Sequence, residues 1–187
     1  MVRSRDMNRR LSLSFLLTMI VAALFVTFGA PKTASAQGAW VHTGDAVRTK
    51  SVGPFTAKVY SIRHDMKEKV TKSKQAVIDA DVDKRFSWKM LRSVDAEKIR
   101  NALREGYAKN GYSDGGKIDS FIASIAKELK EGDAVTISYD HAKKTTTITT
   151  PGGSATVPGE AFMKATWSLW FGNIDQPQLG DSLLNKF

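Results

Sequence analysis

Alternating apolar and polar positions predict two strands in the first half of the domain. They occupy residues 54–63 and 85–91, and residues 64–74 between them are rich in lysine and poor in apolar side chains. We therefore expect this middle segment to be a solvated excursion and not a part of the sheet. The positions that would share one side of a strand are Phe55, Ala57 and Val59 in the first and Phe86, Trp88 and Met90 in the second.

A helical repeat of apolar residues begins after Asp95, which is a good N-cap. Further helices are predicted over residues 117–130 and 160–171, and Gly172 ends the second of these. The tail, residues 179–187, predicts a last short amphipathic helix. The apolar positions of the first three helices are Ile99, Ala102, Leu103, Gly106 and Tyr107; Ile118, Phe121, Ile122, Ile125 and Leu129; and Phe162, Ala165, Thr166 and Leu169.

A hairpin is predicted between the second and third helices. Residues 134–139 and 145–150 are rich in β-branched side chains, and the polar segment 140–144 joins them. Residues 155–157 supply a third short strand. Strands and helices do not alternate regularly, which excludes a parallel sheet built from strand–helix–strand units. The order predicts an α+β domain, with a mainly antiparallel sheet and its helices gathered on one face.

Residues 1–36 have the pattern of a targeting segment that is separate from the domain. A short basic stretch precedes twenty uncharged residues, 11–30, and Ala34 and Ala36 then fit a signal-peptidase site. One alternative is a cleaved signal peptide, which leaves Gln37 as the mature N-terminus. The other is an uncleaved membrane anchor, because residues 11–30 are just long enough to span a bilayer.

Both alternatives place the single domain, residues 37–187, outside the cytoplasmic membrane, because basic residues before an apolar segment stay inside. After cleavage the protein would be periplasmic or secreted. Without cleavage it would be anchored to the inner membrane, and we expect membrane contact only through residues 11–30. The sequence leaves the oligomeric state open.

Composition removes several classes of function. The chain has no cysteine, so disulfides, thiolate catalysis and iron–sulfur clusters are excluded. Nearly half of its net charge of +9 belongs to residues 1–36, and the remainder is too weakly basic to indicate nucleic-acid binding. The three histidines, His42, His64 and His141, have no metal-ligand spacing and are expected to be exposed or incidental. No metal and no cofactor are predicted.

Several short motifs follow one another along residues 40–187. They are GDAVRTK at 44–50, KVYSI at 58–62, RSVDAEK at 92–98, EGY at 105–107, KEGD at 130–133 and LWFG at 169–172. In this order and spacing the motifs resemble the chalcone isomerase-like family. The resemblance implies an open-faced β-sandwich of chalcone isomerase type, in which helices back a large, mainly antiparallel sheet. The family includes plant isomerases that close a chalcone into a flavanone, plant fatty-acid binders and exported bacterial members, and this chain looks most like the last group.

The resemblance also implies where a ligand would bind. Arg48 matches the arginine on the floor of the family's cleft, and Tyr60 matches a tyrosine of the fatty-acid binders where the isomerases have threonine. Ile99, Gly106 and Leu169 stand where the isomerases have polar residues, so the cyclising apparatus is missing and no catalytic residue is expected. The ligand-binding residues that follow from this resemblance are Arg48, Tyr60, Ile62, Ile99, Leu103 and Trp170.

Three functions compete at this point. The first is non-catalytic binding of a fatty acid or similar amphipathic carboxylate, with Arg48 and Tyr60 on the anion. The second is an isomerase for a chalcone-like planar phenolic, in which Arg48 stabilises an oxyanion. The third is an envelope interaction module with Trp167 and Trp170 on its surface. Two structural alternatives also stay open: aromatics that only pack the core, and an Arg48 that only makes an internal salt bridge.

Overall fold

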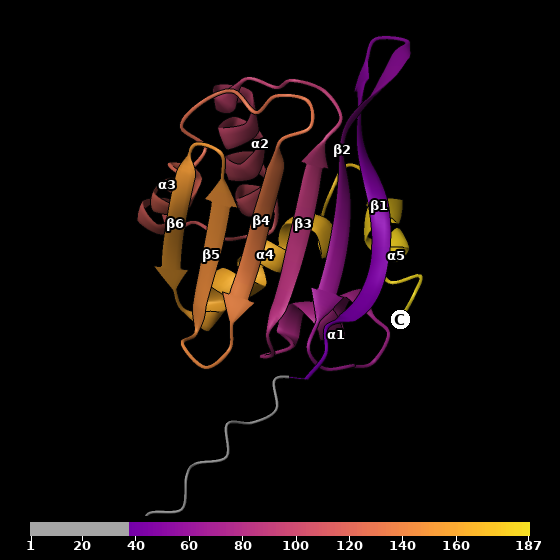
Figure 1. Cartoon of the computed structure of the whole chain (residues 1–187), viewed down its shortest axis with the longest axis vertical. Helices are drawn as coiled ribbons and strands as arrows, with labels where there is room; N and C mark the ends of the chain where they lie inside the picture. The colour runs from indigo at the N-terminus through magenta and orange to yellow at the C-terminus, as the bar shows by residue number, and fades with distance from the viewer. Residues whose placement is uncertain (1–37) are drawn as a thin grey trace, which may run out of the picture. The chain divides into compact units, whose positions relative to one another are not determined.

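The computed structural model describes residues 38–187, which form one six-stranded antiparallel sheet with five helices on one face (Figure 1). The strands follow one another in chain order. They are β1 (Val41–Val52), β2 (Phe55–Met66), β3 (Lys84–Met90), β4 (Ala134–Asp140), β5 (Thr145–Thr150) and β6 (Gly153–Pro158). The helices are α1 (Lys74–Asp79), α2 (Ala96–Lys109), α3 (Gly115–Ile122), α4 (Glu160–Phe171) and α5 (Pro177–Ser182).

This architecture confirms the predicted α+β fold, and residues 36–187 form a compact unit of their own. The side chain of Asp95 caps α2 by accepting the backbone N–H groups of Glu97 and Lys98. Helix α4 has the predicted bounds, and Gly172 is its C-cap. The predicted targeting segment, residues 1–36, lies outside the described residues. None of the helices within residues 38–187 is long and apolar enough to span a bilayer.

The first two strands differ from the sequence prediction. β1 was not predicted, and β2 continues past residue 63 to Met66, through the beginning of the supposed excursion. His64, Asp65 and Met66 are all buried. The prediction was wrong because it treated polar residues as solvated, whereas Asp65 accepts hydrogen bonds from Arg63 and Arg85 on the open face of the sheet. Helix α1 begins at Lys74, the last residue of that segment.

His64 is completely buried between the sheet and α4, which contradicts its predicted exposure. The indole N–H of Trp167 donates to His64 Nε2 at 2.9 Å. An indole N–H is only a donor, so Nε2 carries no proton and the proton of the neutral ring sits on Nδ1. Nδ1 therefore donates to Thr43 Oγ1 at 2.7 Å, and that hydroxyl donates to the carbonyl of Leu183 at 2.8 Å. This chain of bonds connects β1, β2, α4 and the tail.

His64 makes the stability of the fold depend on pH. Burial, with a smaller contribution from the charge of Lys84, lowers the pKa of His64 from 6.5 to about 3. The unfolded chain takes up this proton near pH 6.5 and the folded chain only near pH 3, so stability falls as the pH drops between these values. We expect the free energy of unfolding in urea to fall by about 2 kcal/mol from pH 7.5 to pH 5, where most carboxylates stay ionised. The exposed His141 gives a matched control: His141→Gln should keep this dependence, and a flat profile in the parent protein would contradict the assignment.

Two other boundaries differ from the prediction. Helix α3 ends at Ile122 instead of residue 130, and Ile125 and Leu129 are nevertheless fully buried. Leu129 reaches the core from a short bridge that pairs its backbone with Val94. The apolar spacing therefore identified the buried side chains correctly, but it could not distinguish a continuous helix from a turn that buries the same residues. Helix α5 begins and ends earlier than the predicted 179–187.

The tail is held against β1 at one glycine. An added Cβ on Gly44 would lie 2.3 Å from the backbone oxygen of Ser182 and 2.6 Å from the carbonyl carbon of Leu183. No side chain fits at this distance, so only glycine lets β1 and the tail approach so closely. Leu179, Leu183 and Leu184 extend the core behind β1 as a result. The core therefore begins at the first strand of the sheet and includes the end of the chain.

Candidate functional site

A cavity of about 480 Å³ lies between α2 and the end of the sheet formed by β1, β2 and β3. Helix α4 and the following loop, residues 173–175, supply the rest of its wall. Its volume falls in the range of sites for small organic ligands. The apolar lining residues are Ala57, Val59, Tyr60, Trp88, Met90, Val94, Ile99, Ala102, Leu103, Leu169, Trp170 and Ile174. The polar and charged groups stand around this apolar interior, which suits an elongated or planar ligand with one polar end.

Arg48 and Tyr60 face each other across β1 and β2. They are direct partners in the antiparallel register, although twelve positions separate them in the sequence. The register shifts between Arg48 and Thr49, which leaves Val59 as an extra residue on β2. This β-bulge changes which set of alternate residues on β2 faces inward, from Ala57 and Val59 to Tyr60, Ile62 and His64. Both Val59 and Tyr60 consequently line the cavity.

Arg48 is largely buried and already has partners. Its side chain is 17% exposed, and its guanidinium donates to Asp175 Oδ1 at 2.5 Å and to Gln176 Oε1 at 3.3 Å. Lys50 donates to the second oxygen of Asp175 at 3.2 Å. Burial opposes ionisation of Asp175, but these two cations hold the pKa of its carboxyl below the usual range. The structural alternative of an internal salt bridge is therefore present, and the cavity beside it is still open.

Gln176 fixes the position of this ion pair on β1. Its side-chain oxygen accepts the backbone N–H of Thr49 at 2.9 Å, and its amide nitrogen donates to the carbonyl of Val47 at 3.0 Å. The amide therefore hydrogen-bonds to the backbone on both sides of Arg48. These hydrogen bonds join β1 to the loop after α4 at Arg48, which the sequence predicted as a ligand-binding residue. They also hold Asp175, the neighbour of Gln176, next to Arg48.

Three aromatic side chains form the inner wall next to Arg48. Tyr60 stacks on Trp88 with ring centroids 4.8 Å apart, and Trp170 meets the edge of Trp88 at 5.3 Å. The indole N–H of Trp170 donates to the Tyr60 hydroxyl at 3.0 Å. Burial raises the pKa of Tyr60, so its hydroxyl keeps its proton at neutral pH. The phenol thus accepts one bond and has a proton to donate to a ligand.

The opposite wall is apolar where α2 and α4 meet. Ile99, Leu103 and Gly106 come from α2, and Leu169 comes from α4. An added Cβ on Gly106 would lie 2.7 Å from Leu169 Cδ2, so the absence of a side chain allows this close approach. Ile99, Gly106 and Leu169, which stand where the isomerases have polar residues, therefore lie together on this wall. The same lining also contains charged side chains from α2 and its N-cap, namely Asp95, Lys98, Glu105 and Lys109.

The comparison with known proteins identifies the family. The model of the chalcone isomerase-like family matches residues 25–184 of the chain. The chain belongs to this family. A solved structure with the same fold, described as a fatty-acid binding protein of Arabidopsis thaliana, superposes with a TM-score of 0.61. The two chains are 14% identical, and the superposition covers 79% of this chain and 88% of the other. No curated protein matches the chain.

The structure brings together five of the six ligand-binding residues expected from the chalcone isomerase-like family. Arg48, Tyr60 and Trp170 lie at one end of the lining, with Ile99 and Leu103 on the opposite wall. The sixth, Ile62, is 1% exposed and packs in the hydrophobic core, outside the cavity lining. Ile62 lies on the inward face of β2, two residues after Tyr60, and its side chain packs in the core and does not reach the cavity.

Two residues of the site were missed by sequence reasoning. Trp88 was noted only as an aromatic on a strand, yet it lines the cavity and its buried indole N–H has no hydrogen-bond partner among residues 38–187. Asp175 was not noted, because a lone aspartate 127 positions from Arg48 gives no signal of pairing in one sequence. Within the described part of the chain, no three His, Asp or Glu side chains are gathered so that they could hold a metal ion.

Lys84 is a chemically unusual residue outside the cavity. It is fully buried, and burial lowers the pKa of its amine to about 7. Its Nζ donates to the carbonyls of Val77 and Ile78 at 2.7 and 3.2 Å, which are groups at the end of α1. The amine also lies 4.8 Å from the ring centre of Trp167. Lys84 therefore has a structural role, because it caps the C-terminal end of α1. It does not line the cavity.

The tryptophans that the envelope-interaction hypothesis needed at the surface are buried. Trp167 has no exposed surface, and Trp170 is 2% exposed. Trp167 stacks on Phe86 in the core, and Trp170 contacts the same ring. The core-packing interpretation is correct for Trp167, whereas Trp170 both packs the core and lines the cavity. Neither is available to a protein partner, which leaves the cavity as the better candidate for function.

Proposed function

We propose that this chalcone isomerase-like protein binds a fatty acid or similar amphipathic carboxylate without chemical change. The observation that supports this most is the pair Arg48 and Tyr60, which stand opposite each other at one end of an apolar cavity of about 480 Å³. The fold is shared with a fatty-acid binding protein, which is consistent with the same class of ligand. The apolar wall would hold the acyl chain, and the pair would hold the headgroup.

The ligand would enter by exchanging carboxylates at Arg48. Asp175 occupies one side of the guanidinium, and Lys50 also holds it. A fatty-acid carboxylate would replace Asp175 on Arg48 and accept a hydrogen bond from the Tyr60 hydroxyl, while Asp175 stays with Lys50. Arg48 keeps a carboxylate partner in both states, so its buried charge is never left unpaired. The chain supplies the larger share of the affinity, and the headgroup supplies the smaller share, because its ion pair with Arg48 replaces an existing one.

The acyl chain is expected to set the affinity through its length. Each methylene removed from water contributes about 0.8 kcal/mol, so six to eight of them contribute roughly 5–6 kcal/mol before ordering costs. A series of saturated fatty acids titrated into residues 37–187 by calorimetry should therefore show affinity rising about fourfold per methylene until the cavity is full. The methyl esters serve as matched controls, since they keep the chain and lose the charge. No dependence on chain length, or equal binding of acids and esters, would contradict the proposal.

The isomerase alternative has little support in the cavity. Arg48 could stabilise an oxyanion, but Ile99, Gly106 and Leu169 line the cavity at the positions where the isomerases have polar residues. Cyclisation of a phenolic substrate also requires positioned polar groups that manage the proton. Because the polar groups around Arg48 already bond to one another, we do not assign a catalytic residue. An Arg48-dependent rate of chalcone cyclisation above the spontaneous rate would reverse this conclusion.

We also propose that the protein works outside the cytoplasmic membrane, either periplasmic or secreted or anchored to the inner membrane. This rests on the sequence of residues 1–36, with its uncharged stretch and the small residues Ala34 and Ala36. Free fatty acids need a carrier in such an aqueous compartment. Fractionation of cells that produce the full chain, with mass analysis of its N-terminus, tests the location and the cleavage together.

A further inference from the structure

The β1–β2 hairpin extends beyond the rest of the sheet. β3 pairs with β2 only from Tyr60 to Met66, so the hairpin residues 49–58 pair with each other and with no third strand. Figure 1 shows this two-stranded end projecting past the neighbouring strands. A two-stranded ribbon gains little stability from such an extension. The protein nevertheless maintains it, with Gly53 in the left-handed conformation at its turn.

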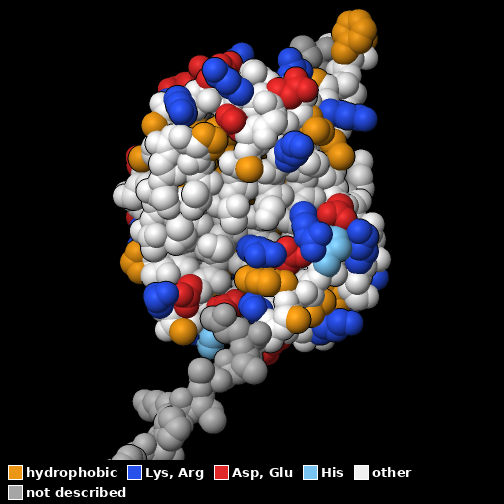
Figure 2. Space-filling view, in the orientation of Figure 1, with side chains coloured by type: hydrophobic (Ala, Val, Ile, Leu, Met, Phe, Trp, Pro, Cys, Tyr) orange, Lys and Arg blue, Asp and Glu red, His pale blue; other side chains and the backbone are white. Residues whose placement is uncertain are grey.

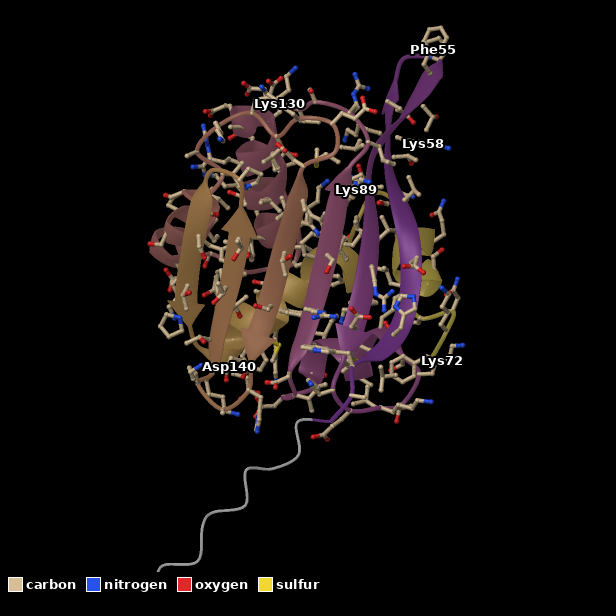
Figure 3. All side chains as sticks on the ribbon, viewed as in Figure 1. Phe55, Lys58, Lys72, Lys89, Lys130 and Asp140 are labelled. Carbon is tan, nitrogen blue, oxygen red and sulfur yellow. The ribbon has the colours of Figure 1, made fainter. Side chains whose placement is uncertain are left out.

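The end of the hairpin is apolar and exposed. Phe55 is 75% exposed, the largest value among the bulky apolar side chains that the structure describes, and its ring stands at the tip (Figure 3). Figure 2 shows a hydrophobic side chain at this projecting end. Leu91, also exposed, follows β3 and donates its backbone N–H to the carbonyl of Val59 at 2.9 Å. Two of the three bulky apolar side chains that the structure describes as exposed therefore belong to this end of the sheet. Exposed apolar groups of this kind mark contact sites.

Basic residues surround this apolar end. The hairpin stretch from Arg48 to Lys58 contains three cations and no acidic residue. Lys58 and Lys89 are exposed, do not line the cavity, and lie below Phe55 at the same end of the molecule (Figure 3). Asp175 pairs with Arg48 and Lys50, so Lys58 is the hairpin cation outside this ion-pair group. The loops 91–95 and 130–133 carry Asp95, Glu131 and Asp133, and the first and last of these accept backbone N–H groups. A partner that carries negative charge over an apolar layer would complement this surface.

The cavity reaches almost to the tip. Lys50 and Ala57, which face each other in the hairpin register, both line the cavity. The turn begins two rungs further on, where Val52 pairs with Phe55. Two residues of extended strand span about 7 Å. Any surface that contacts the tip is therefore brought to about 7 Å from the cavity wall.

We propose that the hairpin tip docks on an anionic phospholipid bilayer. Phe55 enters the boundary between headgroups and acyl chains, while Lys58 and Lys89 lie against the lipid phosphates. The cavity then stands at the membrane surface, and an acyl ligand passes between bilayer and cavity with little exposure to water. The role of the docked state in ligand transfer rests on the proposed function, whereas docking itself requires only the tip and its charges.

Vesicle binding of residues 37–187 tests docking directly. The domain should sediment with vesicles made of equal parts phosphatidylglycerol and phosphatidylcholine, and much less with pure phosphatidylcholine or in about 1 M salt, where charge is screened within 3 Å. Phe55→Ser should weaken partitioning about tenfold through lost apolar burial. The double variant Lys58→Gln/Lys89→Gln should weaken it about 10- to 30-fold, because each lysine near an anionic surface contributes roughly a factor of five.

The matched control is Lys69→Gln/Lys72→Gln, which removes the same charge from exposed lysines of the loop before α1. Lys72 lies at the opposite end of the sheet from Phe55 (Figure 3). The control should bind vesicles within about twofold of the parent if the tip is the docking site. Docking is overturned if the parent stays in solution, or if the tip variants and the control lose binding equally. A parent that binds vesicles but no fatty acid would uphold docking and contradict only the proposed function.

Discussion

The Arg48→Gln variant is expected to bind a long-chain fatty acid about 10- to 100-fold more weakly than the parent domain. Hydrogen bonds to a charged group contribute about 1.5–3 kcal/mol, and glutamine keeps most of the shape while it removes the charge. The apolar wall stays intact, so the loss should appear in the headgroup contribution. Titration calorimetry with a free acid and with its methyl ester measures this, because the variant should bind the ester as the parent does.

A second variant of the same site should change affinity in the opposite direction. Asp175→Asn removes the carboxylate that competes for Arg48, so fatty-acid binding should become several-fold tighter. Arg63→Gln is the matched control for the first variant, because Arg63 also pairs with a buried carboxylate, that of Asp65, but on the open face of the sheet. Equal affinity of Arg48→Gln and the parent would show that the arginine is purely structural and that the headgroup binds elsewhere.

The Trp167→Ala variant is expected to lose about 3–5 kcal/mol of unfolding free energy, the largest effect on stability that we predict. Trp167 has no exposed surface, stacks on Phe86, and supplies the hydrogen bond to Nε2 of His64. Its removal leaves a large cavity and a buried nitrogen without a partner. Since small domains have a total stability of about 5–15 kcal/mol, the variant should be close to unfolding.

Urea denaturation of the domain compares this variant with Trp40→Ala. Trp40 lies half-buried at the start of the fold, where Arg85 and Lys67 pack over its ring at 4.1 and 4.8 Å. Cation–π contacts at such sites contribute about 0.5–1 kcal/mol each, so this second loss should be much smaller. Similar losses in the two variants would show that α4 does not organise the core through Trp167. Trp167→Phe should then show an intermediate loss, because it keeps one aromatic ring in the core and removes the donor together with the second ring of the indole.

Local patterns predicted much of this fold because local physics decides those features. Asp95 caps α2 through its own side chain, and Gly172 ends α4, so both helices could be placed from a few neighbouring residues. The β-branched runs of β4 and β5 predicted their hairpin for the same reason. The family resemblance placed Arg48 and Tyr60 at one site, and the register of β1 and β2 makes them direct partners.

The tertiary structure alone decided the features that depend on distant residues. The Val59 bulge changes the inward face of β2, Asp175 meets Arg48 across 127 positions, and His64 is buried by Trp167 across 103. In each case a polar residue or an irregular strand is stable because its partner arrives from another part of the chain. Sequence patterns reflect local preferences for secondary structure and burial. These pairings, in contrast, form only when segments that are distant in the sequence come together in the folded protein.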